Sequence, residues 1–92
     1  MIAKEAIVVN QLGMHARAAA KFVHLATRFE SRITVARQAR QMDGKSIMGL
    51  LLLAASRGSR ITIAAEGSDA QQAVDELAAL VESGFGEDVC SV

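Results

Sequence analysis

Apolar and polar positions alternate in three short stretches that are rich in Ile, Val and Thr. These stretches are residues 3–9, 32–37 and 60–66. A period of two is typical of a strand that buries one face. A fourth, weaker strand is predicted at residues 40–43, joined to the preceding one by a tight turn at Gln38 and Ala39. The alternation predicts an antiparallel sheet with helices on one face and solvent on the other.

Two further stretches repeat their apolar residues at helical spacing. In residues 16–29 the apolar face comprises Ala19, Phe22, Val23, Ala26 and Phe29, and the opposite face carries Arg17, Lys21, His24 and Arg28. A second helix is predicted at residues 47–55. Its inward residues are Leu50, Leu53 and Ala54, its outward residues are Met48, Leu52 and Ala55, and Ile47 and Leu51 lie at the border.

A third predicted helix has the clearest end signals. Ser68 and Gln71 match a capping box at its start, Gly84 ends it, and Phe85 stands where a C-terminal cap places an apolar contact. Its buried stripe is Val74, Leu77, Leu80 and Val81. The predicted order is β-α-β-β-α-β-α, which is two split β-α-β units and a closing helix. The fold class is therefore α+β.

With 92 residues, the chain is short enough to form one domain, residues 1–92, in which residues 88–92 are expected to form a frayed tail. The apolar run at residues 47–55 is far shorter than the ~20 residues that cross a bilayer. Lys4 and Glu5 interrupt the N-terminus where a signal peptide would be apolar, and the single cysteine, Cys90, can form no internal disulfide. We therefore expect a soluble, cytoplasmic protein with no membrane insertion.

The formal net charge is zero, but the two signs are segregated along the chain. All ten Lys and Arg residues lie in residues 1–60, and most of the acidic residues lie in residues 61–92. This asymmetry favours an acidic partner surface or nucleic acid, unless folding disperses the charges. Nucleic acid is disfavoured because the chain has no Tyr or Trp to stack on bases, and its three Phe residues are expected in or near the core.

His15 stands at the predicted start of the first helix, in the segment LGMHARAAAKF. The first N–H groups of a helix have no partner within it, and the helix dipole places positive charge there, so the position favours an anion. An unprotonated imidazole nitrogen there could attack a phosphoryl group, whose charge would meet the backbone N–H groups of Ala16 and Arg17 and the Arg17 guanidinium. The alternative is a surface histidine that only caps the helix. No metal site is expected, because the other histidine, His24, is more than two helical turns away.

The chain resembles the HPr family, the histidine-phosphorylated carrier proteins of the phosphoenolpyruvate-dependent phosphotransferase system. The resemblance rests on LGMHARAAAKF, GKSIMGLLLLAASRGSRITIAAEG and LVESGFGED, together with the length and the predicted element order. It implies an HPr-like open-faced sandwich and a phosphoryl carrier that is not an enzyme and has no cofactor. It also implies that Enzyme I phosphorylates His15 on Nδ1, that a IIA-type acceptor removes the phosphoryl group, and that Arg17 is the active-site arginine.

One residue departs from the family pattern. The family usually has proline after this arginine, whereas this chain has Ala18. Alanine restores a backbone N–H that proline lacks, and this donor is available for a cap at residue 15 or for the phosphate. The departure therefore bears on the rate and lifetime of phosphorylation.

Ser46 begins the second predicted helix, where a hydroxyl caps free N–H groups. GKSIMG is also similar to the regulatory site that HPr kinase/phosphorylase phosphorylates in relatives that have this enzyme. The outward apolar residues of the helix favour a docking surface, and the resemblance implies that Enzyme I and the acceptor bind there. This docking surface comprises Arg17, Ala20, Lys21, Ile47, Met48 and Leu51.

The resemblance leaves two relays open, one in sugar transport and one in nitrogen-related regulation, of which LGMHAR and SGFGED favour the second. The alternative function is a regulatory binding module of the same fold that acts without phosphotransfer. An independent hydrolase is disfavoured, because no nucleophile, base and orienting group can be placed together near His15. We expect a monomer.

Overall fold

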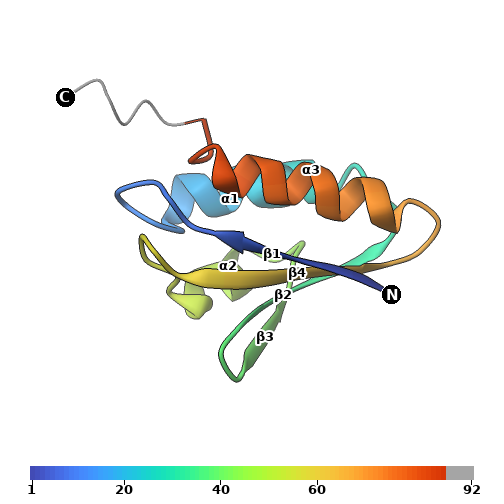
Figure 1. The fold of residues 1–92 in the computed structure, drawn as a ribbon, viewed down its shortest axis with the longest axis horizontal. Coiled ribbons are helices and arrows are strands. Elements are labelled where there is room, and N and C mark those ends of the chain that lie inside the picture. Colours follow the sequence, from blue (N-terminus) through green and yellow to red (C-terminus); the bar gives the residue numbers. More distant parts are fainter. Residues whose placement is uncertain (87–92) are drawn as a thin grey trace.

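In the computed structural model, which describes residues 1–86, four strands and three helices follow the predicted order β-α-β-β-α-β-α. The elements are β1 (Ile2–Ile7), α1 (Ala16–Ala26), β2 (Arg32–Arg37), β3 (Arg40–Asp43), α2 (Ile47–Leu53), β4 (Arg60–Glu66) and α3 (Ala70–Glu82) (Figure 1). The predicted α+β class is confirmed. The expected frayed tail at residues 88–92 lies outside the described residues.

The strands form one antiparallel sheet in the order β1-β4-β2-β3. In the central strand β4, Ile61, Ile63 and Ala65 are buried, whereas Thr62 and Ala64 between them are partly exposed. Side chains alternate between the two faces of a strand, so the first set faces the helices and the second faces away. The sheet thus has one covered and one open face, as the alternation predicts.

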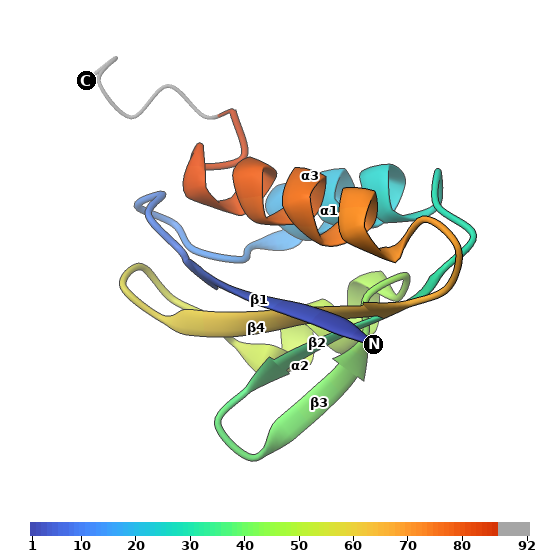
Figure 2. The same ribbon diagram turned by 45° about the vertical axis from the view of Figure 1, so that its right-hand side comes forward.

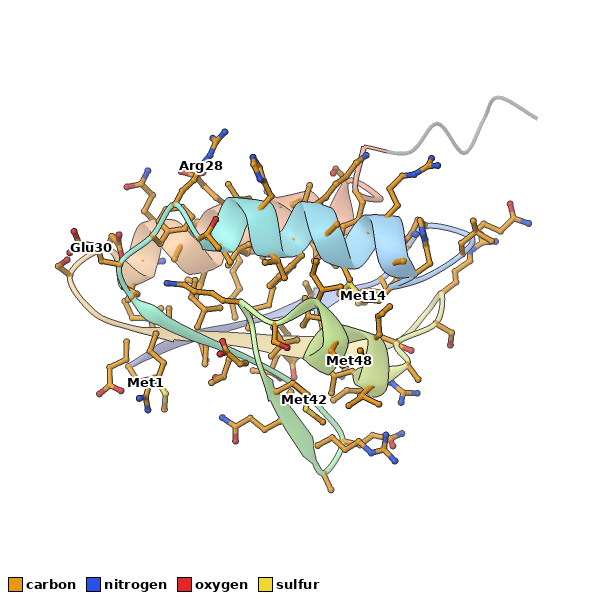
Figure 3. The ribbon with its side chains drawn as sticks, turned by 180° about the vertical axis from the view of Figure 1, so that it is seen from behind. Met1, Met14, Arg28, Glu30, Met42 and Met48 are labelled. Atoms are coloured by element: carbon orange, nitrogen blue, oxygen red, sulfur yellow. The ribbon has the colours of Figure 1, made fainter. Side chains whose placement is uncertain are left out.

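The helices build the covering layer together. α3 packs on β1 and β4, α2 packs on β2 and β3, and α1 contacts both other helices. Figure 2 shows α1 and α3 side by side along the sheet, and Figure 3 shows α1 above the strands and α2 in front of them. All three Phe residues are buried in this layer, as predicted: Phe22, Phe29 and Phe85. No helix within residues 1–86 is long and apolar enough to cross a membrane.

Three elements end earlier than predicted, and β1 and α1 are the first two. β1 ends at Ile7 rather than at residue 9, and the N–H of Val8 donates to a carbonyl of the loop before β4 at 2.9 Å. α1 ends at Ala26 rather than at residue 29, because the N–H groups of Arg28 and Phe29 bond to carbonyls three residues back instead of four. Phe29 is still buried, so its apolar spacing reflects a tight turn that continues the helix face.

The end of α2 corrects the predicted orientation of Ala54 and Ala55. The helix ends at Leu53, and Ala54 has a left-handed backbone with a φ of 53°. Ala54 is therefore exposed and Ala55 is buried, the reverse of the prediction, which had extended a regular helix through both residues. Arg37 and Arg40 donate to the last two carbonyls of the helix at 3.3 and 2.9 Å and stabilise this end.

The predicted capping box of Ser68 and Gln71 at the start of α3 is wrong. The N-cap residue is Asp69, and its side chain makes no cap hydrogen bond. Gln71 donates instead to the carboxylate of Asp75, one turn further along the helix, at 3.0 Å. The residues of a capping box are thus present in the sequence without forming one. The carboxylate of the N-cap residue Asp69 binds another part of the chain instead of its own helix.

The Asp69 carboxylate joins the start of α3 to the loop before β2. It accepts hydrogen bonds from the N–H groups of Glu30 and Ser31, at 2.9 and 3.1 Å, and from the Ser31 hydroxyl. The Ser31 hydroxyl, followed by the Glu30 N–H, holds the pKa of Asp69 below its usual range. The contact therefore favours the ionised carboxylate in the folded chain.

The C-terminal cap of α3 is formed by the residues that the sequence predicts for it. Gly84 has a φ of +76°, its N–H donates to Val81, and the N–H of Phe85 donates to Leu80, both at 3.0 Å. This is the hydrogen-bond pattern of a Schellman cap. Phe85 is fully buried, as the predicted apolar contact requires.

Candidate functional site

His15 is the N-cap residue of α1, as predicted. Its Nδ1 accepts a hydrogen bond from the backbone N–H of Arg17 at 3.3 Å, and its carbonyl accepts one from Ala19 at 2.8 Å. A ring nitrogen that accepts a hydrogen bond presents a lone pair to its donor. The Nδ1 lone pair therefore faces the N-terminus of α1, where the helix dipole favours negative charge.

The loop before His15 is held against the end of α2. The N–H of Met14 donates to the carbonyl of Ala55 at 2.8 Å, and Asn10 Nδ2 donates to the carbonyl of Gly13 at 2.7 Å. Gly13 has a φ of +67°, and a Cβ on it would lie 2.6 Å from the Ala55 oxygen. Glycine is therefore required both for the turn and for the close approach. The contact brings the N-terminus of α1 next to the C-terminal end of α2.

Ala18 lies in the first turn of α1, and its side chain is fully buried. An N–H group in the first turn has no carbonyl partner inside its own helix. Proline is tolerated at such a position for the same reason. The structure thus places Ala18 early in the helix, as expected from the sequence.

α1 presents a basic face to the outside. It exposes Arg17, Lys21 and His24 and contains no acidic residue, and Arg28 follows on the same side, pointing away from the sheet (Figure 3). A groove runs along this face, and it is lined by Arg17, Ala20, Lys21, His24, Leu25, Arg28 and, from α3, Leu80. Lys21 Nζ donates to the carbonyl of Phe85 at 2.8 Å, so its charge lies at the end of α3.

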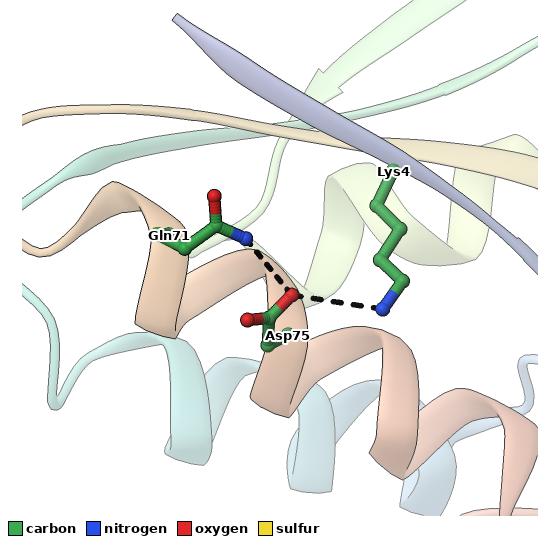
Figure 4. Close-up of polar contacts among 3 residues, drawn as sticks. All are labelled: Lys4, Gln71 and Asp75. Carbon is green, nitrogen blue, oxygen red and sulfur yellow. Dashed lines mark hydrogen bonds and ion pairs between the residues drawn. The ribbon is translucent and has the colours of Figure 1, made fainter.

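The neighbouring helix α3 has the opposite charge. It exposes Asp75, Glu76 and Glu82 and contains no Lys or Arg, and Lys4 of β1 pairs with Asp75 at 3.6 Å (Figure 4). Other basic side chains donate to backbone carbonyls: Arg37, Arg40 and Lys45. The charge segregation of the sequence thus survives folding in part, as a basic α1 beside an acidic α3.

The outward side of α2 is apolar, and the helix contains no charged residue. Met48 is 67% exposed and Leu52 54% exposed, Ile47 is exposed to a smaller extent, and Leu51 is half-buried. Leu12, in the loop before His15, is 72% exposed. The docking surface predicted from the sequence does not include Leu12, although an apolar side chain in a Gly-containing loop beside a candidate site is a signal for it. Leu52 was placed outward but not included in the docking surface.

Ser46 is the N-cap residue of α2, as predicted. Its Oγ accepts a hydrogen bond from the N–H of Gly49 at 3.0 Å, and its own N–H donates to the carbonyl of Asp43 at 3.1 Å. The residue is half-buried. Its hydroxyl therefore caps α2 and lies at the edge of the exposed apolar side of this helix.

Among residues 1–86, no group of three or more His, Cys, Asp or Glu side chains is arranged to hold a metal ion.

Comparison with known proteins places this arrangement in a family. A family model described as the PTS HPr component phosphorylation site matches residues 2–83. The chain belongs to the HPr family. The phosphocarrier protein HPr of Cupriavidus necator is 46% identical, covering 95% of this chain and 98% of its own, and the phosphocarrier protein NPr of Shewanella violacea is 38% identical, covering 91% and 92%. The crystal structure of HPr-C-His from Thermoanaerobacter tengcongensis has a TM-score of 0.91 at 40% identity, covering 96% of this chain and 99% of that one.

As an HPr-family protein, the chain is a phosphoryl carrier of the phosphotransferase system rather than a catalyst. Its open-faced sandwich matches the solved HPr fold over nearly its whole length. In this chain the N-capping His15, the basic face of α1 and the apolar side of α2 are brought together by the hydrogen bond between Met14 and Ala55.

Proposed function

We propose that His15 accepts a phosphoryl group from phospho-Enzyme I on Nδ1 and passes it to a IIA-type acceptor. The observation that carries the proposal is the contact between Nδ1 of His15 and the N–H of Arg17 at the start of α1. It presents the ring nitrogen that holds the lone pair to the helix terminus, where a transferred phosphate finds backbone donors.

In the transfer, the Nδ1 lone pair attacks phosphorus, a nitrogen–phosphorus bond forms, and the bond to the donor atom of Enzyme I breaks. The new phosphate oxygens then replace Nδ1 as the acceptor for the N–H group of Arg17, and the N–H group of Ala16 would donate to them as well. The guanidinium of Arg17, on the exposed side of the first turn, supplies further donors. Attack by an acceptor on the same phosphorus reverses these steps and restores the capping bond.

The docking surface of Arg17, Ala20, Lys21, Ile47, Met48 and Leu51 would bind both partners in turn. Its α1 side is basic and its α2 side is apolar, so it suits a partner with an acidic rim around an apolar centre. Lys21 also binds the carbonyl of Phe85, so its charge is held in one place before a partner arrives. Leu52 of α2 and Leu12 of the loop before His15 are exposed apolar residues that would extend this surface.

Ser46 would act as a regulatory site within the same surface. Its Oγ lies at the N-cap of α2, directly before Ile47 and Met48. A phosphate added by HPr kinase/phosphorylase would be tolerated by the helix but would place about two negative charges beside the surface that an acidic partner must meet. In a cell without such a kinase, Ser46 serves the cap alone.

His15→Ala tests the proposal. We expect the variant to keep its fold, because loss of a capping side chain costs at most about 2 kcal/mol, and to accept no phosphate from Enzyme I and phosphoenolpyruvate. Intact mass and circular dichroism measure the two results. In the unmodified chain the added phosphate should be acid-labile and alkali-stable. A variant that still accepts phosphate on histidine would contradict the assignment. An unmodified chain that binds Enzyme I but accepts no phosphate would favour the alternative function, a regulatory binding module that acts without phosphotransfer.

The relay in which the chain works is tested by its donor. The curated relatives that it matches include both HPr and NPr proteins, and we favour the nitrogen-related branch on the segments LGMHAR and SGFGED. Phosphorylation by a nitrogen-type Enzyme I should then have a higher kcat/KM than phosphorylation by a sugar-type Enzyme I. We propose that the chain acts in the cytoplasm as a monomer, which sedimentation at micromolar concentration would measure.

A further inference from the structure

The four methionines of the chain lie in four different environments. Met14 is buried under the start of α1, and Met42 is half-buried with its Cβ against the backbone of α2. Met1 and Met48 are 89% and 67% exposed. Of these two, Met48 belongs to the docking surface, on the outward side of α2, whereas Met1 precedes β1 (Figure 3). Within residues 1–86, Met48 is therefore the methionine that combines exposure with a place in the docking surface.

We propose that Met48 is a site of reversible oxidation by hydrogen peroxide, and that its sulfoxide weakens docking of Enzyme I. The inference rests on the proposed function of the docking surface. In the reaction, a sulfur lone pair attacks one peroxide oxygen, a sulfur–oxygen bond forms, and the oxygen–oxygen bond breaks with release of water. The sulfur loses two electrons, which the peroxide gains. A methionine sulfoxide reductase reverses the change.

Oxidation would change the chemistry of the docking surface at its least polar part. The seven residues of α2 include no charged side chain, and Ile47 and Leu52 are exposed with Met48 on its outward side. Moving a thioether out of water costs little free energy, whereas the strongly polar sulfoxide must keep a hydrogen-bond donor when it is buried. A partner surface that is apolar at this point provides none, so the oxidised chain binds less tightly.

The fold itself has no reason to change. The Met48 side chain points outward, and the buried residues of α2 are Leu50 and Leu53. Met42 differs in this respect, because its side chain is half-buried and packs against the core, so its oxidation would place a polar group among apolar side chains. Oxidation at Met48 is thus expected to affect docking while leaving the free energy of unfolding nearly the same.

The test uses the full chain carrying Cys90→Ser, since peroxide also oxidises thiols. The chain is treated with hydrogen peroxide, the sulfoxide at each methionine is measured by peptide mass spectrometry, and kcat/KM for phosphorylation by Enzyme I is compared before and after treatment. We expect Met1 and Met48 to oxidise faster than Met42 and Met14. We expect kcat/KM to fall at least about fivefold, as for a polar group buried without a partner, and to recover after treatment with the reductase.

Two matched variants assign the loss. For each variant, kcat/KM after peroxide is compared with kcat/KM of the same variant before treatment. The value for Met48→Leu should stay the same, whereas the value for Met42→Leu should fall by as large a factor as that of the parent chain. The proposal is overturned if Met48 oxidises no faster than buried Met14, if its sulfoxide leaves kcat/KM unaltered, or if Met48→Leu loses activity equally. An untreated chain that accepts no phosphate would instead contradict the proposed function, and the oxidation of Met48 is measured by mass without any phosphotransfer.

Discussion

Gly13 lacks a side chain at the point where the loop before His15 touches the chain after α2. Its φ is +67°, and a Cβ there would lie 2.6 Å from the carbonyl oxygen of Ala55 and 2.9 Å from the Cα of Ser56. Both contacts are with backbone, which cannot rotate aside. The position of His15 relative to α2 thus depends on the absence of one methyl group.

Gly13→Ala should lower the free energy of unfolding by about 2 kcal/mol or more, from the left-handed backbone and the clash together. Denaturant unfolding measures this. Gly58→Ala is the matched control, because Gly58 has a φ of +90° but no atom within 4 Å of its added Cβ, and it should lose only about 1 kcal/mol. Equal losses in the two variants would show that the contact with Ala55 contributes nothing.

Ala18→Pro tests the departure from the family pattern. Because Ala18 is in the first turn of α1, a proline there removes an N–H that has no partner inside the helix. We expect a folded chain that Enzyme I still phosphorylates, with an altered rate or phosphate lifetime. Circular dichroism and phosphate release at neutral pH measure the two properties. Loss of folding would mean that the buried site around Ala18 has no room for the ring.

At the scale of elements, the contact between Asp69 and Ser31 is a long-range bond that connects the start of α3 to the turn between α1 and β2. The carboxylate accepts three donors from residues 30 and 31, so its ionised form is favoured in the folded chain and its pKa is lowered. This one contact orders two element ends that are 38 residues apart in the sequence.

Asp69→Asn should be less stable than the unmodified chain at neutral pH. Since the folded pKa of Asp69 is lowered, its contribution is fully present above the usual carboxyl range and is lost as the pH falls through the folded value. The stability difference between the two chains should therefore shrink toward low pH in denaturant unfolding. Asp75→Asn, on the exposed side of the same helix, is the control. A difference that stays constant with pH would contradict the role of the ionised carboxylate.

At the scale of the whole molecule, the basic face of α1 and the acidic face of α3 lie on neighbouring helices. An acidic partner is attracted to the first and repelled by the second, so the charge distribution orients its approach. Such long-range effects weaken when salt screens them. The apolar side of α2 lacks charge and should be much less sensitive to salt.

Ser46→Asp tests how charge affects docking, because it adds a negative charge at the N-cap of α2. Aspartate is a good N-cap, so stability should change by less than about 1 kcal/mol. Docking should weaken about tenfold to a hundredfold at low salt, because the new charge opposes the acidic groups of the partner. Phosphorylation of His15 by Enzyme I is then slower, with a defect that shrinks as salt is raised. Equal rates for both chains across the salt titration would leave Ser46 as a helix cap only.

The sequence by itself determined the features that depend on neighbouring residues. Strand alternation, the apolar stripe of α1 and the Gly84–Phe85 cap act within a few residues, so the element order and His15 at a helix N-cap could be predicted. The assignment of the family rested on whole segments around these positions. The same local reasoning failed where a regular pattern stopped early, as it did at Ala54.

Only the tertiary structure decided which distant groups meet. The N-cap residue of α3 is Asp69 rather than Ser68, and its carboxylate binds Ser31 of a distant loop instead of its own helix. Arg37, Arg40 and Lys45 donate to carbonyls across the fold, so only part of the basic charge remains together on α1. The bond between Met14 and Ala55 likewise sets His15 beside the apolar side of α2. Periodicity carries no information about such contacts, because they form between side chains and backbone groups whose separation is set by how the layers pack.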